Sequence, residues 1–473
     1  MSISAAKDAD GLPPPRRYWS IVTIALGLFM AVMDGAIANV ALPTIAGDLH
    51  ASPSFSIWIV NGYQLAVVVS LLPLASLGEI VGYRRIYLAG LALFTAASLI
   101  CALSRTLFWL TAARVLQGFG AAGLMSVNAA LVRFTYPHRL LGRGIGINAF
   151  IVAVAAAIGP TLASAILAVG RWPWLFAINL PLGLAALSIG RKVLPRSPLM
   201  THSFDWPSAL LCAIAFGAGI AAIDSAGHLA PPFAYVTEFA AALIAGTTLV
   251  RRQLKQPSPL LPVDLLRIPL FALSIVTSVA SFCAQMLAYV SLPFFFHGYF
   301  GFSAVQIGLF ITPWPIAVAC VAPIAGLLVE RYSAGLLGSI GLLVFAAGLL
   351  ELALLSAHPS TFDVVWRMAL SGAGFGLFQS PNNRTMIAAA PRERSGGASG
   401  MLGTARLLGQ TLGAVLVALM LARYPFAGSR LSLFLGAGFA MVGAILSGLR
   451  LVPRGERGAE AVRVVEGQRV TGE

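Results

Sequence analysis

The stretch Met33–Pro43 reads MDGAIANVALP and places one carboxylate, Asp34, inside an apolar run that begins at Ile21. A helix needs about 20 mainly apolar residues to cross the hydrocarbon core, because every backbone polar group must be satisfied within the segment. A charge inside such a helix is costly and usually marks the path of an ion or a substrate. The stretch therefore predicts a membrane-spanning helix with a functional acid. A structural carboxylate that caps a broken helix near Gly35 is the alternative.

The composition excludes a soluble protein. Of the 473 residues, 58% are hydrophobic and only 10% are charged, and the mean hydropathy is +0.86, far outside the soluble range. The net charge of +14 comes from arginines that gather in short loops and at the ends, so it indicates topology, and no nucleic-acid partner is expected. The cysteines are expected to be buried thiols without a disulfide or a metal site: Cys101, Cys212, Cys283 and Cys320.

Apolar runs between charged or Pro/Gly-rich breaks predict about fourteen spans. Threading the runs alternately places most loop arginines and both termini on one side, which the positive-inside rule makes cytoplasmic. We therefore expect a multi-pass protein of the cell (inner) membrane. The runs cover residues 18–43, 55–77, 86–103, 107–131, 144–168, 174–193, 207–224, 233–250, 269–296, 303–329, 336–356, 362–388, 397–421 and 431–450.

Three matches at nearly one offset indicate an internal repeat, a common device of secondary transporters. The matched pairs are Val40–Pro43 with Val290–Pro293, Glu79 with Glu330, and Arg114 with Arg367. The repeat predicts two six-helix bundles of parallel topology with two helices inserted between them. The expected divisions are a cytoplasmic N-terminal tail at 1–17, the N-terminal bundle at 18–195, the inserted helices with their linkers at 196–268, the C-terminal bundle at 269–452 and a cytoplasmic C-terminal tail at 453–473.

Six motifs follow one another along the chain: MDGAIANVALP (33–43), LGEIVGYRRIYLAGLALF (77–94), ARVLQGFGAAGL (113–124), AAAIGPTLAS (155–164), RWPWLFAINLPLG (171–183) and PLLPVDLLR (259–267). Together they resemble the fourteen-span drug:proton antiporter branch of the major facilitator superfamily. The resemblance covers about residues 19–452. It implies an all-α polytopic membrane protein with two six-helix bundles and two extra central helices. It also implies multidrug efflux in exchange for protons by alternating access, and with it antibiotic resistance.

Asp34 and Arg114 lie at similar depths in the first and fourth predicted spans, so we expect a close pair. A paired guanidinium costs less in a membrane than an unpaired one, and the resemblance links this arginine with proton coupling. An arginine that only holds two helices through backbone carbonyls is equally compatible with the sequence. We assign proton coupling or substrate binding to Asp34, Arg114, Gln117 and Glu351.

The second bundle has lost the charge of the first. The repeat places Ala284 or Gln285 opposite Asp34, so titration at this level belongs to the first bundle. Glu351 is expected to be the other buried acid, at the depth of Arg367. A structural pair between these two residues is favoured over a second proton site.

Two further motifs carry expectations that rest on the resemblance. The loop after the second span, with its echo after the tenth, implies a cytoplasmic contact that holds one conformation closed; here Glu79 replaces the usual aspartate and Ile80 stands where a basic residue is common, so a weaker contact is expected. A role of Arg84 and Arg85 as anchors of the topology is compatible with this contact. The residues of this gating loop are Gly78, Glu79, Gly82, Arg84, Arg85, Glu330 and Arg331. The fifth span keeps Gly159 and Pro160 of the antiporter motif, with Ala155, Ala163 and Ser164 where glycines are typical.

The sequence gives no support for an enzyme. The run Gly118-x-Gly120-x-x-Gly123 matches a dinucleotide fingerprint, but no strand precedes it and it lies in a predicted span. No cofactor or metal is expected. The expected partners are protons, the lipid bilayer and a small-molecule substrate, favoured as an amphipathic cation; the chain is expected to be a monomer, with a periplasmic adaptor as an option. The alternatives are an exporter or facilitator of an endogenous metabolite, lipid or siderophore and, less favoured, a non-transporting receptor or enzyme.

Overall fold

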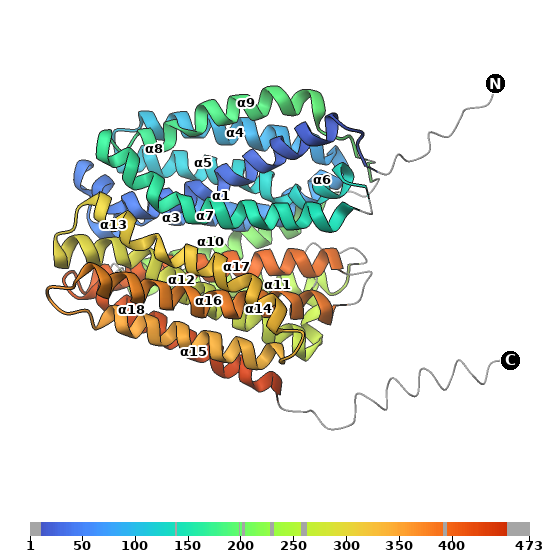
Figure 1. Cartoon of the computed structure of the whole chain (residues 1–473). Helices are drawn as coiled ribbons and strands as arrows, with labels where there is room; N and C mark the ends of the chain where they lie inside the picture. Colours follow the sequence, from blue (N-terminus) through green and yellow to red (C-terminus); the bar gives the residue numbers. More distant parts are fainter. Residues whose placement is uncertain are drawn as a thin grey trace, which may run out of the picture.

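The computed structural model describes residues 11–137, 140–197, 199–200, 204–227, 231–256, 263–390 and 395–451. Within these ranges the ordered elements are helices, and no strand occurs among them. The long helices run side by side, and α1 begins at Arg16 at the same end of the molecule at which α18 finishes at Gly448 (Figure 1). We call this end the terminal end and the opposite one the far end.

The first bundle consists of six spans, three of which are two helices in series. Side chains fix some of the starts: the hydroxyl of Thr106 accepts a hydrogen bond from the Trp109 amide at the start of α5, as N-cap residues do. The elements are α1 (Arg16–Asp48), α2 (Pro53–Ser56) with α3 (Trp58–Val81), α4 (Tyr83–Leu103), α5 (Leu107–Ser126) with α6 (Asn128–Thr135), α7 (Leu141–Val169), and α8 (Trp174–Ala177) with α9 (Asn179–Val193).

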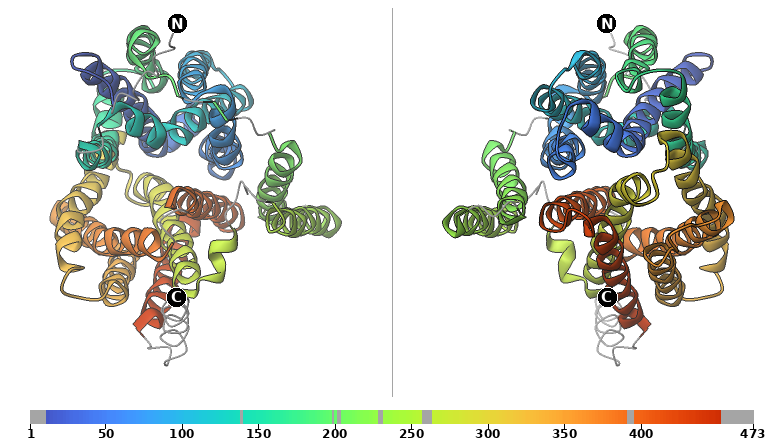
Figure 2. Two further views of the ribbon diagram at one scale, coloured as in Figure 1. Left: turned by 90° about the vertical axis from the view of Figure 1, so that its right-hand side faces the viewer. Right: turned by 90° about the vertical axis from the view of Figure 1, so that its left-hand side faces the viewer.

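The second bundle follows two inserted helices. Seen along the spans, the inserted pair stands beside the bundles, with α10 between α11 and the rest of the molecule (Figure 2). The elements are α10 (Trp206–Gly227), α11 (Pro232–Gln253), η2 (Val263–Arg267), α12 (Pro269–Phe300), α13 (Ala304–Ile311) with α14 (Pro313–Leu328), α15 (Ala334–Ala353), α16 (Thr361–Ala389), α17 (Ser395–Arg423), and α18 (Gly428–Gly448) with η4 (Leu449–Leu451).

Thirteen helices or helix pairs of the described chain are long and apolar enough to cross a membrane. The fourteenth, α16, is less apolar because it carries Arg367, Asn382 and Arg384. It is nevertheless 29 residues long and packs against both α14 and α15. The predicted all-α fold of about fourteen membrane helices is therefore confirmed.

The internal repeat is confirmed by glycines that make the same contact in both bundles. A Cβ atom at Gly90 would lie 2.8 Å from the carbonyl oxygen of Gly120, and a Cβ at Gly341 would lie 2.8 Å from that of Gly374. Neither pair of helices could approach so closely with larger side chains. The glycines of the run 118–123 thus serve helix packing inside α5, as expected, rather than nucleotide binding.

The largest apolar core joins the bundles at the far end. At the far end a single cluster includes Ile37 of the first bundle together with Phe296 and Leu421 of the second. Towards the terminal end there are two smaller cores. One is centred on the first bundle around Tyr87 and includes Leu407 of α17, and the other lies in the second bundle around Phe271. The structure is therefore closed between the bundles at the far end.

Polar contacts support the far-end closure. The hydroxyls of Thr161 in α7 and Thr312, next to α14, are 2.7 Å apart. The Ser164 hydroxyl also donates to the Ala304 carbonyl oxygen at 3.4 Å. These contacts join two helices that belong to different bundles, so they must break when the far end opens.

Two sequence expectations need correction or fall outside the described chain. Three of the cysteine thiols are buried, but Cys320 is exposed on α14, because an apolar run predicts a span and not which of its faces is covered. The predicted C-terminal tail at 453–473 lies outside the described residues, as do the first ten residues of the N-terminal tail. The backbone amide of Leu12 donates to the Thr135 carbonyl oxygen, so the last part of the N-terminal segment is fixed against α6.

Candidate functional site

Asp34 lies in the middle of α1, which runs through Gly35 without a break. Its side chain is enclosed, with the residue 2% exposed. The alternative of a carboxylate that caps a break near Gly35 is therefore wrong, since α1 continues from Arg16 to Asp48. An enclosed acid in an unbroken span must be stabilised by partners from other helices.

Arg114 and Gln117 supply two of these partners. They are three residues apart on α5 and therefore share one face of the helix. Arg114 forms an ion pair through Nη1 with Oδ2 of Asp34, and Gln117 donates through Nε2 to Oδ1 at 2.9 Å. Both residues are fully buried. The predicted close pair between the first and fourth spans is confirmed.

The guanidinium of Arg114 is fixed on several sides. Nε donates to the Ile59 carbonyl oxygen at 3.0 Å and Nη1 donates to Oε1 of Gln117 at 2.6 Å. The guanidinium carbon lies 4.2 Å from the centre of the Tyr63 ring, a cation–π distance. Arg114 thus holds α3 through a backbone carbonyl as well as pairing with Asp34, so both sequence interpretations of this arginine describe real contacts.

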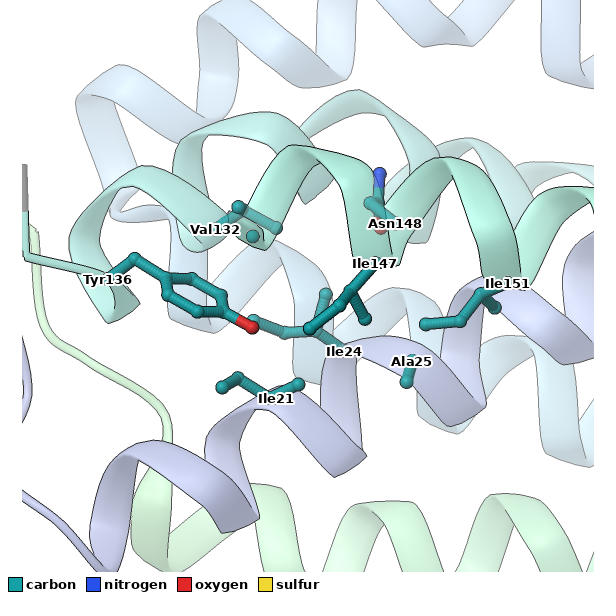
Figure 3. Close-up of a pocket in the computed structure, with 9 residues that line it drawn as sticks. Ile21, Ile24, Ala25, Val132, Tyr136, Ile147, Asn148 and Ile151 are labelled. Atoms are coloured by element: carbon teal, nitrogen blue, oxygen red, sulfur yellow. The ribbon is translucent and has the colours of Figure 1, made fainter. Parts of the chain in front are cut away.

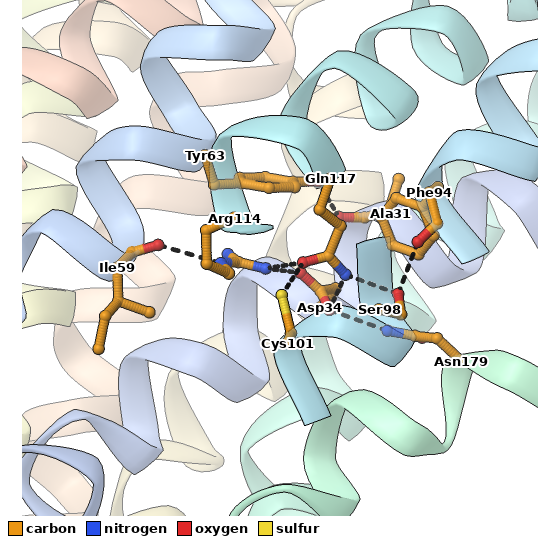
Figure 4. A network of polar contacts seen from close by, with 10 residues as sticks. All are labelled: Ala31, Asp34, Ile59, Tyr63, Phe94, Ser98, Cys101, Arg114, Gln117 and Asn179. Carbon is orange, nitrogen blue, oxygen red and sulfur yellow. Dashed lines mark hydrogen bonds and ion pairs between the residues drawn. The ribbon is translucent and has the colours of Figure 1, made fainter. Parts of the chain in front are cut away.

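Three further residues complete the network and were missed in the sequence (Figure 4). Asn179, at the start of α9, donates through Nδ2 to Oδ1 of Asp34 at 2.9 Å. Ser98 accepts from Gln117 at 2.9 Å, and the Cys101 thiol lies 3.6 Å from Oε1 of Gln117. The signal for Asn179 was present, because it is a polar residue within the quoted motif RWPWLFAINLPLG and at the start of an apolar run.

The network fits an ionised carboxylate. The contacts of Asp34 shown in Figure 4 come from N–H groups of Arg114, Gln117 and Asn179. A protonated carboxyl group would bring its own O–H donor into this arrangement. Adding a proton would also leave the Arg114 charge buried without its counter-ion, which is strongly unfavourable. The surrounding N–H donors and the Arg114 charge thus all match a carboxylate acceptor at Asp34.

Glu351 does not join this site. It pairs with Arg367 in the second bundle, with Nε and Oε2 3.3 Å apart, and Asp363 is a second partner of that arginine at 3.2 Å. The side chain of Glu351 is 44% exposed, so the expectation of a buried acid is wrong, because α15 ends only two residues further on. The pairing with Arg367 that the sequence favoured is present.

The gating-loop residues lie at the turn between α3 and α4. Gly82 adopts a φ of +105° there, a conformation that favours glycine, while Gly78 is buried where a Cβ would meet the Tyr83 ring at 2.9 Å. Arg84 donates to the Arg191 carbonyl oxygen. Arg85 donates to the Val81 carbonyl oxygen at 3.4 Å.

The second copy of this loop looks different. Glu330 and Arg331 are exposed in the turn after α14. In the first copy, the backbone carbonyl of Glu79 accepts a hydrogen bond from the Met200 amide. This hydrogen bond ties the first loop to the segment that precedes α10. The gating role of both loops stays a prediction.

The antiporter-motif helix packs closely against both bundles. A Cβ at Gly159 would lie 2.6 Å from the Ala36 Cβ of α1, and a Cβ at Gly308 of α13 would lie 2.5 Å from the Pro160 carbonyl oxygen. Ala155, Ala163 and Ser164 are buried as well. Small residues are thus needed where α7 meets α1 and α13, although most are not glycine.

A fourth polar residue missed in the sequence is Arg406 in the middle of α17. Its guanidinium carbon lies 5.8 Å from the centre of the Phe282 ring, and its Nε is buried without a hydrogen-bond partner in the described chain.

A small pocket between α1, α6 and α7 has no charged residue in its lining, so we assign no role to it (Figure 3). Its lining residues are Ile21, Ile24, Ala25, Val132, Tyr136, Gly144, Ile147, Asn148 and Ile151.

Two repeated helical bundles, with a charge pair buried inside one of them, define a multi-pass membrane transporter. The chain belongs to the Major Facilitator Superfamily, whose model matches residues 24–414. This membership indicates a transporter of small molecules rather than an enzyme.

Relatives and solved structures agree with this assignment. The chain is 58% identical to the uncharacterized transporter YebQ of Escherichia coli (strain K12), over 94% of this chain and 97% of the relative. It is 31% identical to the riboflavin transporter RibZ of Clostridioides difficile (strain 630), over 83% and 86% of the two chains. It is 32% identical to the multidrug resistance protein Stp of Mycobacterium tuberculosis (strain CDC 1551 / Oshkosh), over 86% and 76%.

One solved structure with the same fold is a bacterial homologue of the human lysosomal transporter Spinster in an inward-facing and unoccupied conformation. It has a TM-score of 0.68 at 15% identity, and the match covers 93% of this chain and 97% of that one. At this identity the similarity shows the fold alone.

Proposed function

We propose that the protein exports amphipathic small molecules, drugs and biocides among them, in exchange for protons. The observation that carries this proposal is the sealed contact of Asp34 with Arg114, Gln117 and Asn179. A buried acid whose environment accepts only one of its protonation states links proton binding to conformation. The multidrug resistance protein among the relatives supports the substrate class.

The coupling follows from the charges. In the far-end-closed conformation Asp34 is ionised and balances Arg114. A proton on Asp34 removes this balance and favours a conformation in which Arg114 can reach another partner or water. Each ligand shifts the equilibrium by its differential affinity for the two conformations, so proton entry from one side drives substrate exit to that side.

The direction of transport rests on the topology proposed from the arginine distribution. With both termini in the cytoplasm and the protein in the inner membrane, the far end faces outward, and the far-end closure seals the region between the bundles from the outside. The division of the chain into the predicted tails, bundles and inserted helices, a monomeric state and the optional periplasmic adaptor belong to the same proposal.

The decisive test is Asp34→Asn in proteoliposomes. A screen of dyes, quaternary ammonium compounds and biocides in an efflux-deficient strain first supplies a transported compound. We expect the variant to lose accumulation of this compound driven by a pH gradient, because asparagine cannot carry the proton, while exchange of labelled for unlabelled compound without a gradient continues.

Two measurements make the outcome decisive. The melting temperature of the purified variant shows whether it folds, because the change leaves Arg114 without its counter-ion. Asp48→Asn, at the far-end limit of the same helix, is the matched control and should transport normally. Full gradient-driven accumulation by folded Asp34→Asn would exclude proton coupling through this residue.

A second candidate is export or facilitated diffusion of an endogenous metabolite. The riboflavin transporter among the relatives favours it. In that case exchange of the metabolite in proteoliposomes would have the same rate and the same end point with and without a pH gradient, and the resistance screen would yield no transported biocide.

A further inference from the structure

Arg406 occupies the point at which the shared core of the two bundles divides. Its neighbours in the chain belong to different apolar clusters: Ala405 to the terminal-end core of the second bundle and Leu407 to that centred on the first. The ring of Phe282, against which the guanidinium lies, belongs to the far-end cluster. The side chain therefore sits between the bundles, at the inner limit of the far-end closure.

The contacts of the neighbouring turns agree with this position. One turn further along α12, the Met286 sulfur accepts a long hydrogen bond across the bundles from Nε2 of Gln64 at 3.9 Å. Oε1 of Gln64 is buried without a hydrogen-bond partner in the described chain. On α17, Gln410 is one turn from Arg406 and therefore on the same face, and it is partly exposed, as Arg406 is.

Within the described part of the chain, no acidic side chain pairs with Arg406. Asp34 in the first bundle already forms an ion pair with Arg114, and Glu351 in the second bundle already forms one with Arg367. A membrane protein rarely keeps an arginine at mid-span without a partner, and such a residue usually marks a substrate or ion path.

We propose that Arg406 binds the carboxylate of an amphipathic aromatic acid, whose ring packs beside Tyr289, the partly exposed member of the aromatic cluster that begins at Phe282. A guanidinium presents a planar pair of N–H groups that matches a carboxylate. The Phe282 ring is 5.4 Å from that of Phe375, and Tyr289, two turns along α12, is 4.9 Å from Trp314. This inference rests on the proposed transport function and replaces the favoured cation with an anion as the substrate class.

A cation would not suit this location. The earlier preference for a cationic substrate depends on Asp34 as the shared site for proton and substrate, and Asp34 is 2% exposed within its own network. The positive charge that faces the region between the bundles belongs to Arg406. The geometry points to separate tasks, with the proton handled in the first bundle and the substrate charge recognised on α17.

The test uses three ligands that share the naphthalene ring system and differ in charge. They are the anion 2-naphthoate, the neutral 2-naphthamide and the cation 2-naphthylmethylammonium. Binding is measured by tryptophan fluorescence on the full-length protein in phosphatidylcholine nanodiscs, which contain no net-anionic lipid that could occupy the site. We expect the wild type to bind the carboxylate at least about tenfold more tightly than the amide, because the carboxylate forms a hydrogen-bonded charge pair. The ammonium ion should bind more weakly than the amide.

Variants assign the preference to the residue. Arg406→Gln should bind the carboxylate and the amide equally, Arg406→Lys should keep part of the preference, and Gln410→Glu should reduce it by giving Arg406 a partner within the helix. Arg105→Gln, at an exposed loop position, is the matched control and should bind as the wild type does. Melting temperatures identify any variant that fails to fold. If Arg406→Gln does not fold, the carboxylate preference of Arg406→Lys and Gln410→Glu tests the proposal instead.

Three results would overturn the proposal. They are no binding of 2-naphthoate to the wild type, tighter binding of the ammonium ion, and an unchanged carboxylate preference in folded Arg406→Gln. None of these results depends on proton coupling. The Asp34→Asn experiment therefore tests proton-coupled transport separately from the role of Arg406.

Discussion

At the scale of single residues, the site is defined by the nitrogen atoms that donate hydrogen bonds to the Asp34 carboxylate. Asp34 receives hydrogen bonds from amide nitrogens of Gln117 and Asn179 at 2.9 Å each, in addition to the Arg114 ion pair. Hydrogen bonds to a charged group are worth about 1.5–3 kcal/mol, roughly twice the value for neutral pairs. The amides therefore stabilise the ionised acid as well as orienting it between α5 and α9.

Replacing Asn179 tests this assignment. Asn179→Leu keeps the approximate volume and removes one donor to Asp34, so we expect a loss of about 1–3 kcal/mol of folded-state stability and a lower proton-driven transport rate. Thermal unfolding in nanodiscs and the proteoliposome assay measure the two effects. Ser188→Ala, exposed on the same helix, should change neither, and wild-type stability of Asn179→Leu would contradict the role.

At the scale of elements, the inserted helices are tied to both bundles. α10 contacts α3 and α17, and at its far end the Trp58 indole donates to Asp224 at 3.2 Å while Arg423 donates to the Ala226 carbonyl oxygen at 3.0 Å. At the other end, Asp205 precedes α10 and accepts from Arg252 and Gln256 at the end of α11. The pair is thus a unit that bridges the bundles rather than a loose linker.

Asp205 makes the stability of this unit depend on pH. Partial burial opposes its ionisation, but hydrogen bonds from Ser208, Gln256 and Arg252 outweigh burial and lower the pKa of Asp205 to about 2. Because the usual value is near 4, the carboxylate stabilises the folded state above about pH 4, and this contribution is lost as the pH falls towards 2.

The corresponding variant is Asp205→Asn. Its melting temperature should lie a few degrees below that of the wild type at pH 7, and the difference should shrink between pH 4 and pH 3. A difference that is constant over this pH range would show that the carboxylate acts only through its shape. Asp264→Asn, in η2, provides a comparison at another acid outside the spans.

At the scale of the whole molecule, the two bundles share their largest apolar core at the far end. Nearer the terminal end each bundle has a smaller core of its own, and Leu407 of α17 packs into that of the first bundle. Alternating access requires the shared part to separate while each bundle keeps its own packing. The closely packed glycines of α5 and α16 lie inside the bundles, which makes rigid-body movement of two intact units the expected motion.

A cross-link at the far end should stop this motion. In a Cys320→Ala background, which removes the exposed native thiol, Thr161→Cys with Thr312→Cys places two thiols where hydroxyls are 2.7 Å apart. Oxidation should abolish transport and reduction should restore it. Each single-cysteine variant should be insensitive to oxidant, and undiminished transport by the cross-linked double variant would refute a rocking motion that opens the far end.

The sequence predicted the site in part. Asp34 and Arg114 could be paired because both depths follow from helix rise and both are charges in apolar runs. Arg406 and Asn179 were missed for different reasons: Asn179 carries no charge, and Arg406 lies in a span whose polar residues gave no indication of their partners. Glu351 was placed at the correct level but too deep in the protein, since a sequence position does not show how near a helix end the solvent reaches.

The sequence by itself determined the number and length of the spans, the repeat, and the similar depths of Asp34 and Arg114 in their spans. The physical reason is that a membrane requires about 20 apolar residues for each crossing and that charges within a span are few. Only the tertiary structure decided which side chains meet. The donors around MDGAIANVALP come from α5 and α9, and the absence of a described acid beside Arg406 depends on how α17 lies against α12. Those contacts arise from packing between helices distant in sequence, where hydrophobicity fixes depth but not the rotation of each helix about its axis.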